Sequence, residues 1–354
     1  MKLISGYLRA LRKSHVSLYL TDSGGAIKAT GLFPKLNIEW GGAIGYEGPA
    51  LHVHEAADLK DALELVERVG CDAALPALKS ADMQEYQDDI HLDGDGYELP
   101  AIAWAPIVLG CVSNDDIRPN LCAPFVCYTR HAAYVVGTDG YSLAAVCDRP
   151  DFVHHVDEPE LEAHIPLDII CSDKNSVICE SVVTEKGGYV VLFSGCGTTV
   201  RISWTAPRET PPKWAAVLPA PTESFDFDVL CSKPPKQASK KTTRVGLLYG
   251  DDGVPANVLV YFDDEEDIIA AIDHDGILVP GPLQVTTSLQ GSILGNLHKL
   301  ISKSIKSDVY IDVPSGPNAP VAINHSDGEQ SLLVLAVPLR GSARDLELLQ
   351  AHLG

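Results

Sequence analysis

The sequence predicts an α+β protein made of three successive stretches that share one order of elements: a helix, several strands, a second helix and further strands. Two observations support this fold class. The chain has 354 residues, 45% of them hydrophobic and 21% charged, which suits two or three domains with buried cores. Short apolar or alternating runs recur along its whole length, separated by segments rich in Gly, Pro or acidic residues. The repeat lies in the order of the elements and not in the sequence itself.

The first stretch, residues 1–98, is expected to form the first domain. Amphipathic patterns predict helices over residues 3–13 and 58–69. An acidic, Gly-rich segment at residues 88–96 closes the stretch as a boundary loop. Between the two helices, strands are predicted over residues 16–20, 26–32 and 36–40.

The second stretch, residues 99–221, repeats this order. A short helix is predicted over residues 106–112, where Pro106 is tolerated in the first turn, and another helix begins within residues 165–171. A Pro-rich segment at residues 207–221 closes the stretch. Strands are predicted over residues 123–129, 132–136, 142–147, 189–194 and 198–204.

The third stretch, residues 222–340, contains the longest predicted helix, residues 289–306. A tail at residues 341–354 is left over. Strands are predicted over residues 245–249, 258–262, 268–272, 283–287, 309–313, 321–323 and 332–337.

The chain is strongly acidic, with 48 acidic and 27 basic residues and a net charge of −21, which excludes a general basic coat for nucleic acid. Part of the basic minority is nevertheless ordered. On a helical wheel Lys303 and Lys306 fall within about 40° of Lys299, opposite an apolar face. One side of the predicted N-terminal helix likewise carries Lys2, Arg9, Arg12 and Lys13. These rows are either solvated helix faces without a partner or a positive surface for a nucleic-acid backbone.

No motif for catalysis is present: the sequence has no phosphate-binding loop, nucleophile elbow or His-Glu-x-x-His helix. We therefore expect neither an enzyme nor a cofactor. His52, His54 and Glu55 have no other ligand cluster near them in the sequence, so surface histidines are favoured over a metal site. The sequence lacks a membrane span and a signal peptide, and its nine cysteines form no Cys-x-x-Cys pair, which favours a reduced, cytoplasmic protein.

Four segments, in order along the chain, together resemble the bacterial DNA polymerase III beta subunit, the sliding clamp. Residues 136–144, Val-Gly-Thr-Asp-Gly-Tyr-Ser-Leu-Ala, resemble a second-domain signature that commonly reads Ala-Thr-Asp-Gly-His-Arg-Leu-Ala. Upstream, residues 115–121 resemble the acidic–Arg–Pro–x–Leu segment of that domain. Residues 212–219 resemble the hinge Phe-Pro-Asp-Tyr-x-x-Val-Leu-Pro, and residues 333–340 resemble the terminal strand Tyr-x-x-Met-Pro-Met-Arg. Residues 1–98 are assigned by position and element order alone.

The resemblance implies a DNA-clamp fold, in which three pseudo-repeated domains form a ring with helices lining the hole and sheets outside. The domains would be residues 1–98, 99–221 and 222–340, followed by the tail at residues 341–354. It also implies that the two basic helix faces form a channel for double-stranded DNA, held through phosphates whatever the base sequence. Two chains would close the ring as a homodimer.

The resemblance further implies an apolar pocket between the second and third domains that binds short peptides of DNA polymerase and the clamp loader. Carried over position by position, the pocket takes Leu121, Thr138, Gly140, Tyr141, Ser142, Leu143, Pro212, Ala216, Val217, Leu335, Val337, Pro338, Leu339 and Arg340. Tyr141 and Ser142 replace the family's His-Arg and Ala216 replaces an Arg, so the apolar floor is kept while polar rim contacts are lost. Ordinary packing between domains is the alternative role for these residues.

The function implied is that of a sliding clamp, which tethers a replicative polymerase to DNA in a bacterial or phage-infected cell. The divergent, short first domain suggests a phage-encoded clamp. It also leaves an alternative: a clamp-fold adaptor that binds replication proteins without encircling DNA. In the tail, residues 345–349 resemble the Gln-Leu-x-Leu-Phe peptide that clamps bind. The tail is therefore expected either to pack as a short helix on the third domain or to compete for the pocket.

Overall fold

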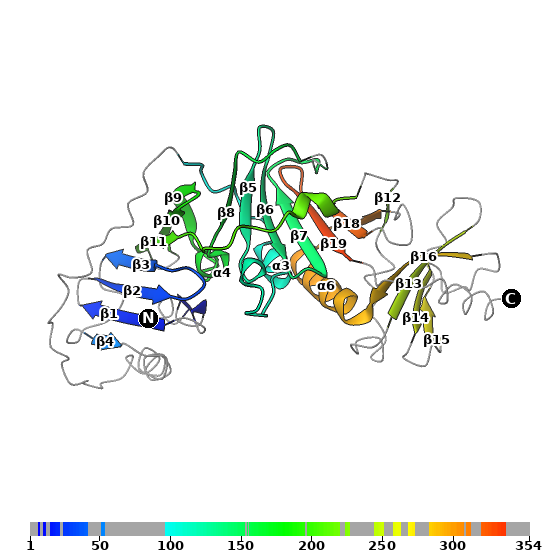
Figure 1. Cartoon of the computed structure of the whole chain (residues 1–354), viewed down its shortest axis with the longest axis horizontal. Coiled ribbons are helices and arrows are strands. Elements are labelled where there is room, and N and C mark those ends of the chain that lie inside the picture. The colour runs from blue at the N-terminus through cyan, green and yellow to red at the C-terminus, as the bar shows by residue number, and fades with distance from the viewer. Residues whose placement is uncertain are drawn as a thin grey trace. The chain divides into compact units, whose positions relative to one another are not determined.

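The computed structural model of the chain (Figure 1) divides into two compact units. Unit 1 comprises Met1–Pro100, Asp116–Tyr128 and Pro159–Pro211, and unit 2 comprises Ala101–Asp115, Thr129–Glu158 and Pro212–Gly354. The three-domain division stays a prediction. The structure describes residues 6–7, 10–11, 15–21, 24–41, 51–53, 96–152, 154, 156–194, 197–219, 224–226, 244–250, 258–262, 268–272, 283–307, 309–312 and 320–337.

Unit 1 is built on a seven-stranded antiparallel sheet in the order β4-β1-β2-β3-β11-β10-β9. The first stretch contributes β1 (His15–Thr21), β2 (Gly24–Thr30), β3 (Leu36–Gly41) and β4 (Leu51–Val53). The second contributes β9 (Val177–Thr184), β10 (Gly187–Phe193) and β11 (Thr199–Thr205). Pairing of β3 with β11, with Trp40 opposite Val200 and Leu36 opposite Trp204, joins the two stretches into one sheet.

This sheet buries one face, as the side-chain alternation of a strand dictates. In β3, Ile38 is buried while Glu39 is exposed. In β11, Val200, Ile202 and Trp204 are all buried, and the intervening side chains are not. The core of unit 1 therefore lies on the face of the sheet to which these alternating apolar side chains point.

A buried histidine, His164, lies in a strand pair of unit 1 outside the seven-stranded sheet. Strand β5 (Phe125–Tyr128) pairs with β8 (Leu161–His164), and the short helices η2 (Pro119–Leu121) and α4 (Leu167–Ile170) belong to the same unit. His164 is 2% exposed, and neither ring nitrogen has a hydrogen-bond partner among the described residues. Burial lowers the pKa of His164; the nearby backbone carbonyls of Ala123 and Pro124 oppose this shift without cancelling it.

We expect this histidine to make unit 1 less stable as the pH falls. Above the ordinary histidine pKa of about 6.5 both the folded and the unfolded chain hold the ring neutral. Below it the unfolded chain takes up a proton first, so the free energy of unfolding falls until the pH reaches the lowered pKa of the folded state. In thermal melts from about pH 7.5 to about pH 5, His164→Gln should lose less stability than the wild type. Ile27→Val, a change at a fully buried position of β2 in the same unit, is the control and should keep the wild-type slope. Equal slopes for His164→Gln and the wild type would contradict this account.

Unit 2 contains six neighbouring antiparallel strands in the order β12-β17-β18-β19-β7-β6. Strands β6 (Ala133–Thr138) and β7 (Ser142–Cys147) come from the second stretch. The third stretch supplies β12 (Ser224–Asp226), β17 (Tyr310–Asp312), β18 (Val321–Ser326) and β19 (Ser331–Ala336). Every residue of β7 and β19 is buried, so their pairing forms an apolar seam between the second and third stretches.

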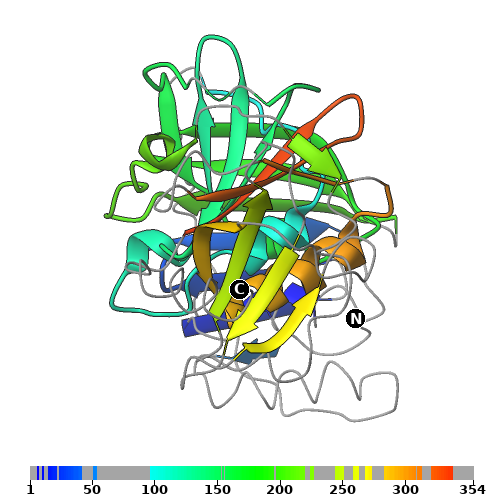
Figure 2. The same ribbon diagram turned by 90° about the vertical axis from the view of Figure 1, so that its right-hand side faces the viewer.

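A second sheet of unit 2 leads into its long helix. The sheet has the order β15-β14-β13-β16, formed by β13 (Arg244–Gly250), β14 (Val258–Phe262), β15 (Ile268–Ile272) and β16 (Leu283–Gln290). Helix α6 (Gly291–Ser304) follows β16 directly and packs on α3 (Ala105–Gly110), which in turn contacts β6 and β7 (Figure 2). Within this packing, a Cβ built on Gly137 of β6 would lie 2.3 Å from the Val108 carbonyl oxygen of α3.

The predicted α+β class is confirmed, and most predicted strands lie within a few residues of observed ones. Strands β7, β14 and β15 match to the residue, and the predicted helices at residues 106–112 and 289–306 correspond to α3 and α6. Four short or irregular strands, β4, β8, β9 and β12, were not predicted. The predicted helix at residues 58–69, the tail and most of the helix at residues 3–13 lie outside the described residues. Within the described part of the chain, no helix is long and apolar enough to span a membrane.

Candidate nucleic-acid interface and partner surface

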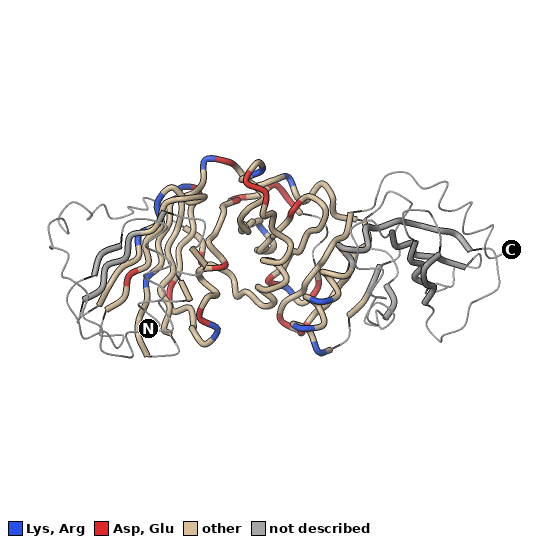
Figure 3. The backbone as a smooth tube through the Cα atoms, turned by 90° about the horizontal axis from the view of Figure 1, so that it is seen from below, with Lys and Arg blue, Asp and Glu red and all other residues tan. Residues whose placement is uncertain are grey.

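The exposed face of α6 carries a row of basic side chains. Leu297 and Ile301 are buried, whereas Lys299 and Lys303 are exposed, as the helical period dictates for residues on opposite faces. The helix contains no acidic residue. Figure 3 shows basic positions in blue along the part of the tube that α6 occupies in Figure 1. A cationic surface thus lies on a chain whose net charge is −21.

Lys306, the third residue of the row, is exposed but differs from the other two. Because α6 ends at Ser304, Lys306 lies beyond the helix, and its Nζ donates a hydrogen bond to the Ser302 carbonyl oxygen at 2.7 Å. A cation there satisfies one of the last helix carbonyls and opposes the negative end of the helix dipole. The other residues predicted to contact DNA lie outside the described residues: Lys2, Arg9, Arg12 and Lys13.

The turn between β6 and β7 is held by hydrogen bonds around Asp139. Its Oδ1 accepts the backbone N–H of Tyr141 at 2.8 Å, the N–H of Ser142 at 2.6 Å and the Ser142 hydroxyl at 3.0 Å. The Thr138 hydroxyl donates to the Ser142 carbonyl oxygen at 2.7 Å and accepts the Gly140 N–H at 3.1 Å. Gly140 has a φ of 86°, which favours glycine. This pre-organised turn leaves Tyr141 53% exposed.

The end of β19 lies beside this turn. Leu143 pairs with Leu335, and the Val337 N–H donates to the Tyr141 carbonyl oxygen at 2.9 Å. The structure therefore brings together a first group of the predicted pocket residues. Leu143, Ser142 and Leu335 are buried, Thr138 and Val337 are half-buried, and Gly140 and Tyr141 are exposed.

A second group of the predicted pocket residues lies at the short helix η3 (Trp214–Val217). It consists of Ala216 and Val217 within the helix and Pro212, two residues before it. Trp214 is 2% exposed and packs edge-on against the Tyr134 ring of β6, with centroids 5.1 Å apart. Ala216 is exposed, and Val217 is 45% exposed. Leu121 is buried within unit 1, whereas Pro338, Leu339 and Arg340 lie outside the described residues.

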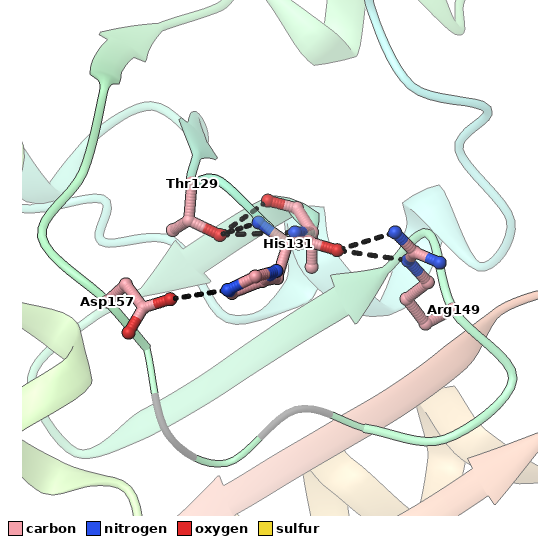
Figure 4. Close-up of polar contacts among 5 residues, drawn as sticks. Thr129, His131, Arg149 and Asp157 are labelled. Atoms are coloured by element: carbon pink, nitrogen blue, oxygen red, sulfur yellow. Dashed lines mark hydrogen bonds and ion pairs between the residues drawn. The ribbon is translucent and has the colours of Figure 1, made fainter.

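Sequence reasoning missed a polar cluster at the turn of residues 129–132, shown in Figure 4. The Arg149 Nε and Nη2 both donate to the His131 carbonyl oxygen, at 3.0 and 2.7 Å. The Asp157 carboxylate lies 3.5 Å from the His131 Nε2, on the opposite side of the turn from Arg149. The segment after β7 is therefore hydrogen-bonded to this turn through Arg149, and the Asp157 carboxylate lies close to the His131 ring. The pattern has no sequence signature because Arg149 and His131 are 18 residues apart without a fixed motif.

No group of three or more potential metal-ligating side chains comes together within the described residues. The site candidates are the lysine row, Lys299, Lys303 and Lys306, and the partner surface, which we define as two exposed groups of unit 2: Tyr141 of the β6–β7 turn, and Ala216 and Val217 of η3.

Comparison with known proteins shows the fold. No protein-family model matches the sequence, and no curated protein matches it. Solved structures do match. The beta subunit of DNA polymerase from Streptococcus pyogenes is 14% identical, with a TM-score of 0.58 over 96% of this chain and 98% of that one. The DNA polymerase III beta subunit from Thermotoga maritima is 12% identical, with a TM-score of 0.61 and the same coverage.

A third match is the Helicobacter pylori beta clamp bound to a DNA ligase peptide. It is 12% identical to this chain, with a TM-score of 0.61 over 96% of this chain and 98% of that one. The chain therefore has the beta sliding-clamp fold over almost its whole length, as the resemblance implied. These bacterial structures give no support to a phage origin.

Proposed function

We propose that this clamp-fold chain is a DNA sliding clamp, a ring that encircles duplex DNA and tethers the replicative polymerase as a processivity factor. In this role it makes and breaks no covalent bond and works in the cytoplasm. Its partners are double-stranded DNA, short apolar peptides of DNA polymerase and the clamp loader, and a second copy of the chain. Likeness to beta clamps along almost the whole chain supports the proposal.

The observation that carries the proposal is the lysine row of α6. On a chain with a net charge of −21, a segregated basic row is where we expect phosphates to bind. Lys299 and Lys303 lie on α6 and Lys306 lies just beyond its end; all three are exposed, and no acidic residue lies between them in the sequence. Because phosphate contacts carry no sequence information, such a row holds DNA while allowing the ring to slide.

A second candidate is an adaptor that binds replication proteins without encircling DNA. It is favoured by the partner surface, whose exposed Tyr141 and Val217 both belong to unit 2 and need no ring. The two candidates share peptide binding and differ in ring closure.

Oligomeric mass separates these candidates. A head-to-tail contact repeated twice closes a ring of two chains. Light scattering on the full chain at micromolar concentration should therefore give twice the chain mass of 37.9 kDa. A clean monomer at that concentration would contradict the ring and leave the adaptor.

Peptide binding should depend on Val217. A synthetic peptide, Gln-Leu-Ser-Leu-Phe, should bind the wild type, and Val217→Asp should weaken it by about 2 kcal/mol, or about 30-fold in Kd, as for an interface anchor. Val217 suits this test better than Leu143, which is buried between paired strands. The matched control is Val177→Asp, at a 64% exposed valine of unit 1. Equal affinities for Val217→Asp and Val177→Asp in fluorescence anisotropy would show that the partner surface is wrongly placed.

A further inference from the structure

Aromatic rings of unit 2 form a column that ends at η3. The Trp214 and Tyr134 rings have centroids 5.1 Å apart, the Tyr134 and Phe152 rings 5.8 Å, and the Phe152 and His154 rings 5.2 Å. Tyr134 is 1% exposed and Trp214 is 2% exposed. Non-parallel ring contacts at these distances are favourable beyond the area that they bury. The column therefore links η3 to β6 and to the segment after β7.

The far end of the column, Phe152 and His154, lies in the segment that follows β7, and this segment is hydrogen-bonded to the residues before and at the start of β6. The Asp148 Oδ1 accepts the Ala133 N–H at 2.9 Å, and Arg149 holds the His131 carbonyl with two hydrogen bonds (Figure 4). Asp157 approaches the same histidine from the other side. Asp148 and Arg149, at the start of the segment that carries Phe152 and His154, are thus hydrogen-bonded to the residues before and at the start of β6.

At the near end of the column, η3 has few other contacts among the described residues that fix its position. It has no side-chain cap, and among the described residues its flanking backbone hydrogen bonds stay local: the Trp214 N–H to the Pro212 carbonyl at 2.8 Å and the Leu218 N–H to the Ala215 carbonyl at 3.3 Å. Local bonds shape a turn but do not fix its place on the sheet. Trp214 is the one buried residue of η3, so its ring carries that role.

We infer that Trp214 is a positioning residue for the partner surface: it holds η3 so that Ala216 and Val217 meet the bound peptide. This inference rests on the peptide site of the proposed function. Trp214 positions η3 through its ring contact with Tyr134 and not through a hydrogen bond, because its buried indole N–H has no acceptor within the described part of the chain. A phenylalanine keeps an edge-on ring contact with Tyr134, whereas a leucine does not.

The test compares Trp214→Phe, Trp214→Leu and Phe152→Leu in the full chain, with the peptide Gln-Leu-Ser-Leu-Phe as probe. Trp214→Leu should raise the Kd of the probe at least tenfold, Trp214→Phe should stay within about threefold of the wild type, and Phe152→Leu should lie between them. The control is Ile202→Ala, a fully buried side chain of unit 1. It should lower the melting temperature without changing the Kd. All four variants should keep the wild-type salt dependence of duplex binding, since none touches the lysine row.

Several outcomes would overturn the inference: a wild type that does not bind the probe, Trp214→Leu binding like the wild type, or Ile202→Ala weakening the probe as much as Trp214→Leu. If Trp214→Leu does not fold, Trp214→Phe and Phe152→Leu decide by the same order of Kd values. Failure of the proposed function is seen separately, as a monomeric wild type without duplex retention. If the four variants still show the predicted order of Kd values, the inference about Trp214 holds, and the chain is the adaptor and not the ring.

Discussion

Reversing the charge of the lysine row should strongly weaken the association of the protein with duplex DNA. The triple variant Lys299→Glu, Lys303→Glu and Lys306→Glu replaces three exposed cations on each chain by anions. A ring of two chains would lose six phosphate contacts, and each contact adds about 0.9 to the slope of log affinity against log salt. We therefore expect the slope to fall by up to about 5 and the affinity at about 0.1 M salt to fall at least tenfold. Fluorescence anisotropy with a labelled 30-base-pair duplex, titrated at several salt concentrations, measures both.

The control for this prediction is a variant with the same change of net charge elsewhere. Lys174, Lys186 and Arg208 are exposed residues of unit 1, and changing all three to Glu also makes each chain more negative by six charges. If the row acts by position, this control should keep most of the wild-type slope. Equal losses from the two triple variants would show that only net charge matters, and the channel assignment would then be wrong.

Adding one methyl group at Gly137 should destabilise unit 2 markedly. In Gly137→Ala the new Cβ would lie 2.3 Å from the Val108 carbonyl oxygen and 3.0 Å from the Val108 Cγ1. The first clash is with backbone, so α3 must move away from β6, and α6 packs on α3. Overpacking of this kind costs about 1–3 kcal/mol, and we expect a fall of about 5–10 °C in the melting temperature.

Gly295→Ala is the matched control, because it is the same substitution inside unit 2. A Cβ on Gly295, within α6, would have no atom within 4 Å apart from its chain neighbours and the backbone of the helix itself. Since alanine favours a helix over glycine by about 1 kcal/mol, this variant should be as stable as the wild type or more stable. Calorimetry in which Gly137→Ala melts at or above the wild-type temperature would contradict the close packing of α3 on β6.

The parts of the fold that could be predicted are those in which local pattern and burial agree. Strand β7 is a short apolar run, and α6 has an apolar face at helical spacing, so both were placed correctly. Strand β9 was missed because its first four residues are all exposed, and its pairing with β10 shifts register between Val191 and Leu192. Its side chains do not follow the alternation that identifies a strand.

The candidate site was only partly predictable, for a similar reason. A helical wheel places Lys299 and Lys303 on one face without any tertiary information. It could not show that α6 ends at Ser304 and that Lys306 turns back to a helix carbonyl. The support beneath the partner surface was hidden too, since Trp214 meets Tyr134 across 80 residues of sequence. Gly137 had no signal of its own, because the motif that the segment resembles carries Ala at this position.

The central claim, that the chain encircles DNA, is tested most directly by whether its retention depends on DNA topology. Chains assembled in the presence of a nicked circular plasmid would be passed over a sizing column at high salt, where contacts to phosphate are weak. A closed ring predicts that protein stays with the circle and is lost when one restriction cut makes the plasmid linear. Retention that is the same on circular and linear plasmid, or absent from both at every salt concentration, would contradict the account.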